Sequence, residues 1–182
     1  PLGALVASGG HTSLYAVGDE EEWLRPRLLG ATRDDAAGEA FDKVAKFLGL
    51  GYPGGPAIER EARGGDPQAI PFPRAVISDG NLDFSFSGLK TAAVRLAEEL
   101  KIDPANPGPI ALDIAASFQQ AVVDVLVTKT VAAAGKHSVS QILLAGGVAA
   151  NKLLRETIAV RSPMAVLIPP IILCTDNAAM VA

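Results

Sequence analysis

The amino-acid sequence predicts an α/β fold in which helices flank a mixed sheet. Near the start of the chain, short apolar runs alternate with glycine-rich and acidic turns, a pattern typical of antiparallel strands. In the last third, strand-like and helix-like segments alternate strictly, which indicates a parallel pair of strands. The chain has 182 residues, 49% of them hydrophobic and 20% charged. It is therefore too apolar to be disordered and long enough for one domain or for one lobe of a larger protein.

The opening of the chain predicts three strands. Residues 2–7 form an apolar run that ends at Gly9 and Gly10, and residues 12–17 resume with strand formers before an acidic turn. Residues 23–29 can supply a third strand. We expect these segments to pair in antiparallel fashion.

A helix is predicted next. Residues 32–35 offer several N-cap candidates, and the helix should run to about Leu48. The apolar positions of this segment share one face: Ala37, Ala40, Phe41, Val44, Phe47 and Leu48. Glu39, Asp42 and Lys46 lie on the opposite face, which must meet water, a ligand or another lobe.

The region 49–109 is predicted to be an irregular insertion. Its first half is rich in Gly and Pro, with one short helical segment near 57–62, and such long irregular stretches suit a lid or a docking surface. Phe84 and Phe86 alternate with serines, as in a short strand. Residues 90–100 then favour a helix that ends at a proline-rich linker.

The remaining elements are a long helix and a βαβα unit. Pro109 suits a helix start, and we expect the following helix to pack on the sheet. Its apolar face carries Ile114, Phe118, Ala121, Val122 and Val125. Strands are expected at 141–145 and 165–168, with a helix at 149–158 between them and a new helix start at 175–176. This order of elements describes a ribonuclease-H-like lobe of the actin, sugar-kinase and chaperone ATPase superfamily.

The composition of the chain argues against several classes of protein. Sixteen Lys and Arg against twenty Asp and Glu give a net charge of −4, so the chain lacks the basic excess of an autonomous nucleic-acid binder. Cys174 is the single cysteine, which excludes an intrachain disulfide and fits a reducing, cytoplasmic compartment. The longest apolar run, 165–174, is interrupted by Pro169 and Pro170 and is too short for a membrane span. We therefore expect no membrane association.

Two glycine turns are candidates for ligand binding. In Ser8-Gly-Gly-His-Thr12 the glycines would let backbone N–H groups approach a phosphate, and a simple hairpin turn is an equal alternative. Gly146 and Gly147 follow a buried strand, where open α/β sheets bind ligands, and Asn151 is placed to hydrogen-bond a nucleotide. The alternative there is a tight turn with Asn151 as a solvated helix residue.

Other polar residues also have a structural and a functional interpretation. Asp176 follows a strand and opens a helix, so its carboxylate serves either as an N-cap or as a metal ligand, and position alone favours the cap. Asp42, four residues before Lys46, suits a surface ion pair better than ligand binding. His11 suits a hydrogen-bonded structural role, and Cys174 lies in an apolar context typical of a core.

Six segments together resemble the tRNA N6-adenosine threonylcarbamoyltransferase family, in its bacterial and organellar branch. They are Ser8-Gly-Gly-His-Thr12, the Asp-Asp-Ala-Ala-Gly-Glu-Ala-Phe-Asp-Lys run at 34–43, Tyr-Pro-Gly-Gly-Pro at 52–56, Asp-Phe-Ser-Phe-Ser-Gly-Leu-Lys at 83–90, Ala-Gly-Gly-Val-Ala-Ala-Asn at 145–151 and Cys-Thr-Asp-Asn-Ala-Ala-Met at 174–180. They occur in the family's order and cover nearly the whole chain.

The resemblance implies a two-lobed actin-like ATPase fold and transfer of a threonylcarbamoyl group from threonylcarbamoyl-AMP to N6 of adenosine 37, in tRNAs that read codons beginning with A. The matching motif implies that the adenylate phosphate and the carbamoyl region are contacted by Val6, Ala7, Ser8, Gly9 and Gly10. Asp42 and Gly55 would contact the sugar and its surroundings, and Asn151 the nucleotide, which is threonylcarbamoyl-AMP, ATP or ADP. Asp176 would bind one divalent metal, iron or zinc. No catalytic side chain is implied within this chain.

The same resemblance implies that residues 1–182 form the second lobe alone. The family's other metal ligands are two histidines of an H-x-x-x-H motif upstream of the Ser8 loop, and the sequence holds neither that motif nor the first lobe. We therefore expect the chain to be inactive by itself. The implied partners are tRNA, a TsaB-like paralogue and a TsaE-like ATPase of the bacterial complex, in the cytoplasm.

Two other functions stay open on the sequence. A non-catalytic TsaB-like binding protein shares the lobe but generally lacks the Cys-Thr-Asp-Asn segment that begins at Cys174. A generic ATPase or sugar kinase of the superfamily would hydrolyse nucleotide without tRNA. A peptidase finds no support, because no H-E-x-x-H or similar motif is present.

Overall fold

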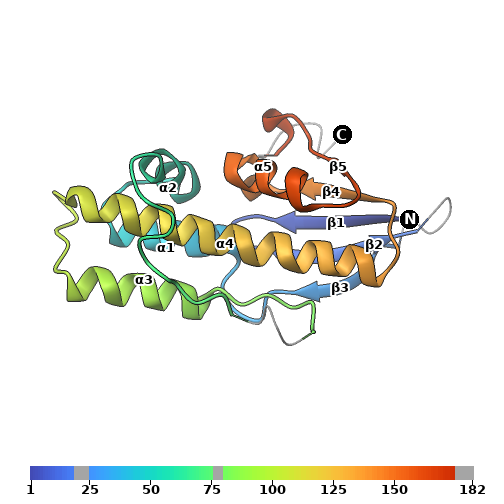
Figure 1. Ribbon diagram of the computed structural model, residues 1–182, viewed down its shortest axis with the longest axis horizontal. Coiled ribbons are helices and arrows are strands. Elements are labelled where there is room, and N and C mark those ends of the chain that lie inside the picture. The colour runs from blue at the N-terminus through green and yellow to red at the C-terminus, as the bar shows by residue number, and fades with distance from the viewer. Residues whose placement is uncertain (19–24, 76–79, 175–182) are drawn as a thin grey trace.

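The computed structural model describes residues 1–18, 25–75 and 80–174 (Figure 1). The strands are β1 (Leu2–Ala7), β2 (Thr12–Val17), β3 (Arg27–Ala31), β4 (Gln141–Ala145) and β5 (Ala165–Leu167). The α-helices are α1 (Ala37–Phe47), α2 (Gly54–Ala62), α3 (Ser87–Glu99), α4 (Gly108–Lys136) and α5 (Lys152–Arg161). Short 3-10 helices, η2 (Gly147–Ala150) and η3 (Ile171–Leu173), follow β4 and β5.

The strands form one mixed sheet in the order β3-β2-β1-β4-β5. β1 pairs antiparallel with β2, and β2 pairs antiparallel with β3. β4 pairs parallel with both β1 and β5, which confirms the predicted parallel pair. Because β1 and β4 are parallel neighbours, with Val6 opposite Ala145, their carboxyl ends lie side by side at one edge of the sheet.

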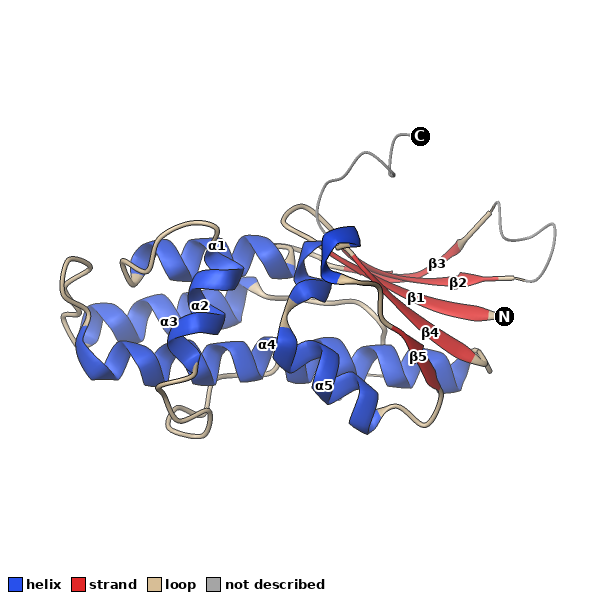
Figure 2. Cartoon of the chain, turned by 90° about the horizontal axis from the view of Figure 1, so that it is seen from above, coloured by secondary structure: helices blue, strands red, loops and turns tan. Residues whose placement is uncertain are grey.

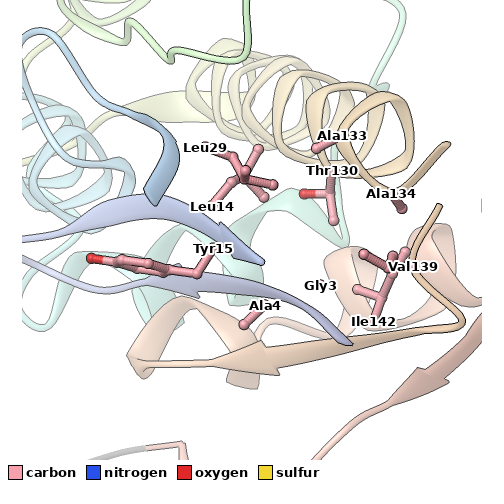
Figure 3. Close-up of a pocket in the computed structure, with 10 residues that line it drawn as sticks. All are labelled: Gly3, Ala4, Leu14, Tyr15, Leu29, Thr130, Ala133, Ala134, Val139 and Ile142. Atoms are coloured by element: carbon pink, nitrogen blue, oxygen red, sulfur yellow. The ribbon is translucent and has the colours of Figure 1, made fainter. Parts of the chain in front are cut away.

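Helices α1 to α4 gather beyond one end of the sheet, and α4 runs on across its face (Figure 2). The first part of α4 packs among helices, and the prediction that α4 packs on a sheet is confirmed for its last turns only. There Thr130, Ala133 and Ala134 lie over Leu14 and Ile142 of the sheet (Figure 3). The gap between them measures about 10 Å³, too small for any ligand larger than water.

Helix α4 is the central element of the hydrophobic core. Ile114, Phe118, Ala121, Val122 and Val125 are all buried, as their shared face predicts. By length and composition α4 could cross a membrane, a property that the apolar runs of the sequence did not reveal. However, 72% of its most apolar stretch is buried inside the described fold, as expected for a core helix.

Two predicted boundaries near the start of the chain are wrong. The third strand occupies Arg27–Ala31 rather than 23–29, of which residues 23 and 24 lie outside the described part. Its pairing with residues 13–16 of β2, not its own apolar run, sets its ends. The N-cap of α1 is Ala36 rather than a residue of 32–35, because the Thr12 hydroxyl on β2 accepts the N–H of Ala37 at 2.9 Å. Phe47, predicted to lie on the apolar face of this helix, is instead 40% exposed.

Two later predictions also need correction. The short strand around Phe84 is reduced to a single bridge with Thr32, and α3 already begins at Ser87. The helix predicted at 149–158 is interrupted at Asn151, whose extended backbone separates η2 from α5. Hydrogen bonds to the distant carboxylate of Asp34 set the start of α3, whereas the side chain of Asn151 itself caps the start of α5.

Candidate functional site

A cavity of about 280 Å³ lies where the loops after β1 and β4 meet helices α1 and α2. The predicted binding residues in its wall are Gly9, Asp42, Gly55 and Asn151. The others, Val6, Ala7, Ser8 and Gly10, belong to the end of β1 and the following loop, outside the cavity wall. The position at the carboxyl ends of two parallel strands is where open α/β sheets bind their ligands.

The loop between β1 and β2 is a hairpin turn fixed by Ser8. The Ser8 Oγ accepts the N–H of His11 at 3.1 Å, and the Ser8 carbonyl oxygen accepts the N–H of Gly38 at 3.1 Å. A Cβ at Gly38 would lie 2.6 Å from that oxygen, so glycine lets α1 approach the loop this closely. A Cβ at Gly9 or Gly10 would meet nothing within 4 Å. The loop is therefore a hairpin turn, as one interpretation held, and its Gly9 also borders the cavity.

The loop after β4 depends on a glycine at position 146. Gly146 has φ +88°, in the left-handed region, and a Cβ there would lie 2.4 Å from the carbonyl oxygen of Ala7. A side chain at this position is excluded by backbone conformation and by space. The close contact brings Gly147 and Val148 to the cavity wall beside the end of β1.

Asn151 is buried, with 5% of its surface exposed, and its side chain is held from both ends. Its Oδ1 accepts the N–H of Leu154 at 3.0 Å, which caps α5. Its Nδ2 donates to Gln119 Oε1 at 2.9 Å and to Glu59 Oε2 at 3.4 Å. The alternative of a solvated helix residue is therefore wrong.

Asp42 lies on α1 in the cavity wall, and its Oδ1 accepts the N–H of Gly54 at 2.7 Å. Asp42 and Lys46 both belong to the described part of the chain, and there the predicted ion pair between them does not form. A backbone N–H at the start of α2 competes better than an exposed lysine, because salt bridges in water contribute little. Gly55, next in the chain, borders the cavity, and a Cβ there would meet no atom within 4 Å.

Glu59 on α2 is a cavity residue that the sequence-based prediction missed. Its Oε1 accepts the N–H of Lys152 at 3.3 Å, and its Oε2 accepts from Asn151. A signal was available, because Glu59 stands four residues after Gly55 and therefore on the same face of a helix. With Asp42 it gives the cavity two carboxylates, which suit a ligand that donates hydrogen bonds from hydroxyl groups.

The family model of TsaD, tRNA N6-adenosine threonylcarbamoyltransferase, matches residues 1–182. Proteins called tRNA N6-adenosine threonylcarbamoyltransferase are 54% identical in Anaeromyxobacter dehalogenans, 54% in Dehalococcoides mccartyi and 53% in Moorella thermoacetica. Each alignment covers 100% of this chain, and 54%, 52% and 52% of the relative. The chain belongs to the tRNA N6-adenosine threonylcarbamoyltransferase family. It spans about half the length of the curated relatives it matches.

Membership of the threonylcarbamoyltransferase family agrees with the sheet order and with the predicted actin-like ATPase fold. The segment 83–90, one of the segments that carry the resemblance, lies outside the cavity wall and holds α3 in place. Asp34 accepts the N–H groups of Phe86 at 2.8 Å and Ser87 at 3.1 Å. It also accepts the hydroxyls of Ser85 and Ser87. Burial alone would raise the pKa of Asp34, but these hydrogen bonds outweigh it and lower the pKa.

Two neighbouring carboxylates, those of Asp35 and Asp83, also hold α3 in place. Asp35 pairs with Lys43 at 2.8 Å and with Lys90 at 2.7 Å, which joins α1 to α3. Burial opposes ionisation of Asp35, yet the two lysines keep its pKa below the ordinary value. Asp83 accepts the N–H of Ala31 at 3.1 Å and pairs with Arg33 at 3.0 Å. These contacts, the bond from Ala31 first, lower the pKa of Asp83 although burial acts to raise it. The segment 83–90 thus joins α3 to α1 and β3, a role that its residue types alone did not reveal.

The resemblance predicts a metal. Within the described part of the chain, no three side chains of His, Cys, Asp or Glu lie together as a candidate ligand group. Asp176 lies outside the described residues. His11 is exposed and its backbone, rather than its ring, bonds Ser8. Cys174 is buried, as expected of a core residue.

Proposed function

We propose that the protein to which this chain belongs transfers a threonylcarbamoyl group from threonylcarbamoyl-AMP to N6 of adenosine 37 in tRNAs that read codons beginning with A. The observation that carries the proposal is the match of the family model along all 182 residues. It is supported by the cavity at the carboxyl ends of β1 and β4, whose wall holds Gly9, Asp42, Gly55 and Asn151.

In the proposed reaction the N6 nitrogen of adenosine attacks the carbamoyl carbon of threonylcarbamoyl-AMP. The bond from that carbon to the phosphate oxygen breaks, AMP leaves, and N6 loses a proton. The role of this chain is to hold the adenylate. Gly9 and Gly10 leave room for the phosphate beside the backbone, and Asp42 and Glu59 offer carboxylate oxygens to the sugar hydroxyls.

We further propose that residues 1–182 form one lobe of a two-lobed protein, with 49–109 as the insertion that carries α2 and α3. Relatives about twice as long support this. The ligands of iron or zinc would then include Asp176 and residues outside this chain. A TsaB-like paralogue, a TsaE-like ATPase and a cytoplasmic location belong to the same proposal and rest on the resemblance alone.

The proposal is tested with the full-length gene product, unmodified tRNA and threonylcarbamoyl-AMP, by mass spectrometry of the modified adenosine. We expect modified tRNA from the full-length protein and none from residues 1–182 alone. Asp42→Asn keeps an acceptor for Gly54 but removes the charge, and should raise the KM for the adenylate roughly tenfold. Asp113→Asn is the matched control, because Asp113 also accepts one backbone N–H, that of Asp66, but lies outside the cavity wall.

Other outcomes would identify the alternatives. Nucleotide hydrolysis without tRNA modification would indicate a generic ATPase of the superfamily. Failure to modify tRNA alone, but stimulation of a separate transferase, would indicate the TsaB-like binding protein. Either result would overturn the proposed function.

A further inference from the structure

Gln119 is a polar residue in the buried part of α4, and only 7% of its surface is exposed. Its neighbours along the helix, Phe118 and Ala121, are completely buried in the hydrophobic core. A buried side-chain amide costs free energy unless its polar atoms are hydrogen-bonded. A glutamine at this position therefore needs a partner, and the partner lies on another element.

The partner is Asn151, at the start of α5. Helices α2, α4 and α5 come together here, with α2 and α5 both packed on α4 (Figure 1). Gln119 Oε1 accepts from Asn151 Nδ2 at 2.9 Å, the shorter of the two bonds made by that nitrogen. The longer one, at 3.4 Å, goes to Glu59 Oε2.

These contacts allow one orientation of the Asn151 amide. The N–H of Leu154 requires an oxygen at its end of the amide, so the nitrogen must face Gln119 and Glu59. An Nδ2 group has two hydrogens. One is held by Gln119, and the other points to Glu59 at the cavity wall through the weaker bond.

We propose that Gln119 is a positioning residue for the nucleotide site. It fixes the Asn151 amide so that one N–H is aimed at the cavity and can pass from Glu59 to an acceptor atom of the bound adenylate. Gln119 lies outside the cavity wall and acts only through Asn151. The inference rests on the proposed function for the identity of the ligand, but the orientation of Asn151 can be tested without any ligand.

The binding test uses Gln119→Met in the full-length gene product, since methionine matches glutamine in length but offers no strong acceptor. Gln120→Met is the matched control on the same helix, because it breaks the bond from Gln120 Nε2 to Asp124 Oδ1 outside the cavity. We expect the affinity for threonylcarbamoyl-AMP, measured by calorimetry, to fall about three- to tenfold in Gln119→Met, the range of one lost hydrogen bond. It should be unchanged in Gln120→Met.

A double-mutant cycle separates positioning from a general effect on stability. With Asn151→Ala already present, Gln119→Met should cause no further loss of affinity, because the group it positions is gone. Losses that add in the double variant, or an unchanged affinity in Gln119→Met, would overturn the proposal.

The ligand-free test follows the Asn151 side-chain amide by NMR. In the unsubstituted protein its protons should exchange with water much more slowly than those of the exposed Asn106. Exchange as fast as that of Asn106 would overturn the proposal even if Gln119→Met failed to fold. Slow exchange in a protein that binds no adenylate would instead leave Asn151 fixed as inferred and contradict the proposed function.

Discussion

At the scale of single residues, the glycines of the loops after β1 and β4 have different roles. Gly146 is required by its backbone, since its φ is +88° and the Ala7 carbonyl oxygen occupies the place of a side chain. Gly9 has open space where a side chain would be, so the fold does not demand glycine there. The space at Gly9 is instead part of the cavity that we assign to the adenylate.

This difference predicts that substitution by alanine affects stability at Gly146 and ligand binding at Gly9. Gly146→Ala should lower the free energy of unfolding by about 1–3 kcal/mol, through left-handed strain and the clash with Ala7. Gly9→Ala should leave the free energy of unfolding nearly unchanged and weaken adenylate binding. Urea unfolding and calorimetry on the two variants check this. A stable Gly146→Ala protein would contradict the steric argument.

The hydrogen bonds of Asp34 predict a pH-dependent contribution to stability. Because the pKa of Asp34 is lowered in the folded protein, its contribution is complete above the ordinary aspartate pKa of 3.8 and is lost as the pH falls through the lower, folded-state value. Asp34→Ala should therefore be less stable than the unsubstituted protein at pH 7, by roughly 1 kcal/mol for a lost helix cap. The difference should vanish in strong acid. Denaturant titrations across the pH range measure it, and a difference that does not depend on pH would be the contrary result.

At the scale of elements, several helices receive their N-terminal cap from another part of the chain. The N–H of Ala37 at the start of α1 bonds the Thr12 hydroxyl on β2, and α3 begins at the carboxylate of Asp34. By contrast, α5 is capped by the side chain of the residue at its own start, Asn151. Caps from a distant segment join elements to one another, so each also fixes the direction in which a helix leaves the sheet.

The cap from β2 predicts a specific loss of stability. Thr12 is buried, and Thr12→Val keeps its shape but leaves the N–H of Ala37 without a partner. The free energy of unfolding should fall by about 1–3 kcal/mol, the cost of an unsatisfied buried donor. Thr12→Ser retains the acceptor and should lose less. Thermal and urea unfolding of both variants provide the comparison, and equal losses would show that packing, not the hydrogen bond, matters at this position.

At the scale of the whole molecule, the cavity exists only because four separate segments meet. The β1 loop, α1, α2 and the β4 loop each contribute to its wall, through Gly9, Asp42, Glu59 and Asn151 among others. The chain covers about half the length of its relatives, in line with our proposal that another part of the protein completes the nucleotide site.

Asp176 carries the prediction that concerns the metal, and it lies outside the described residues. As a ligand, Asp176→Asn should sharply reduce the iron or zinc bound by the full-length protein, because these cations favour a carboxylate over a neutral amide. If Asp176 is only an N-cap, the substitution should leave stability and metal content nearly unchanged, since asparagine caps about as well as aspartate. Elemental analysis of the purified variant distinguishes the metal ligand from the N-cap. Full metal occupancy would exclude Asp176 as a required ligand.

The sequence by itself determined much of the secondary structure and the family. The strands 2–7, 12–17 and 141–145, and the parallel pairing of β4 with β5, follow from apolar runs and their alternation with helices. The glycine turns at the ends of β1 and β4 pointed to the edge of the sheet where the cavity lies. These are local signals, which a linear pattern can carry.

Only the tertiary structure decided which polar side chain meets which partner. Thr12 and Ala37 are 25 residues apart, Gln119 and Asn151 are 32 apart, and Asp34 and Phe86 are 52 apart. No local spacing relates such pairs, so the start of α3 was predicted wrongly, and Glu59 and Gln119 were missed. The physical reason is that a buried polar group must find a partner wherever the packed fold supplies one, and that partner is set by distance in space rather than along the chain.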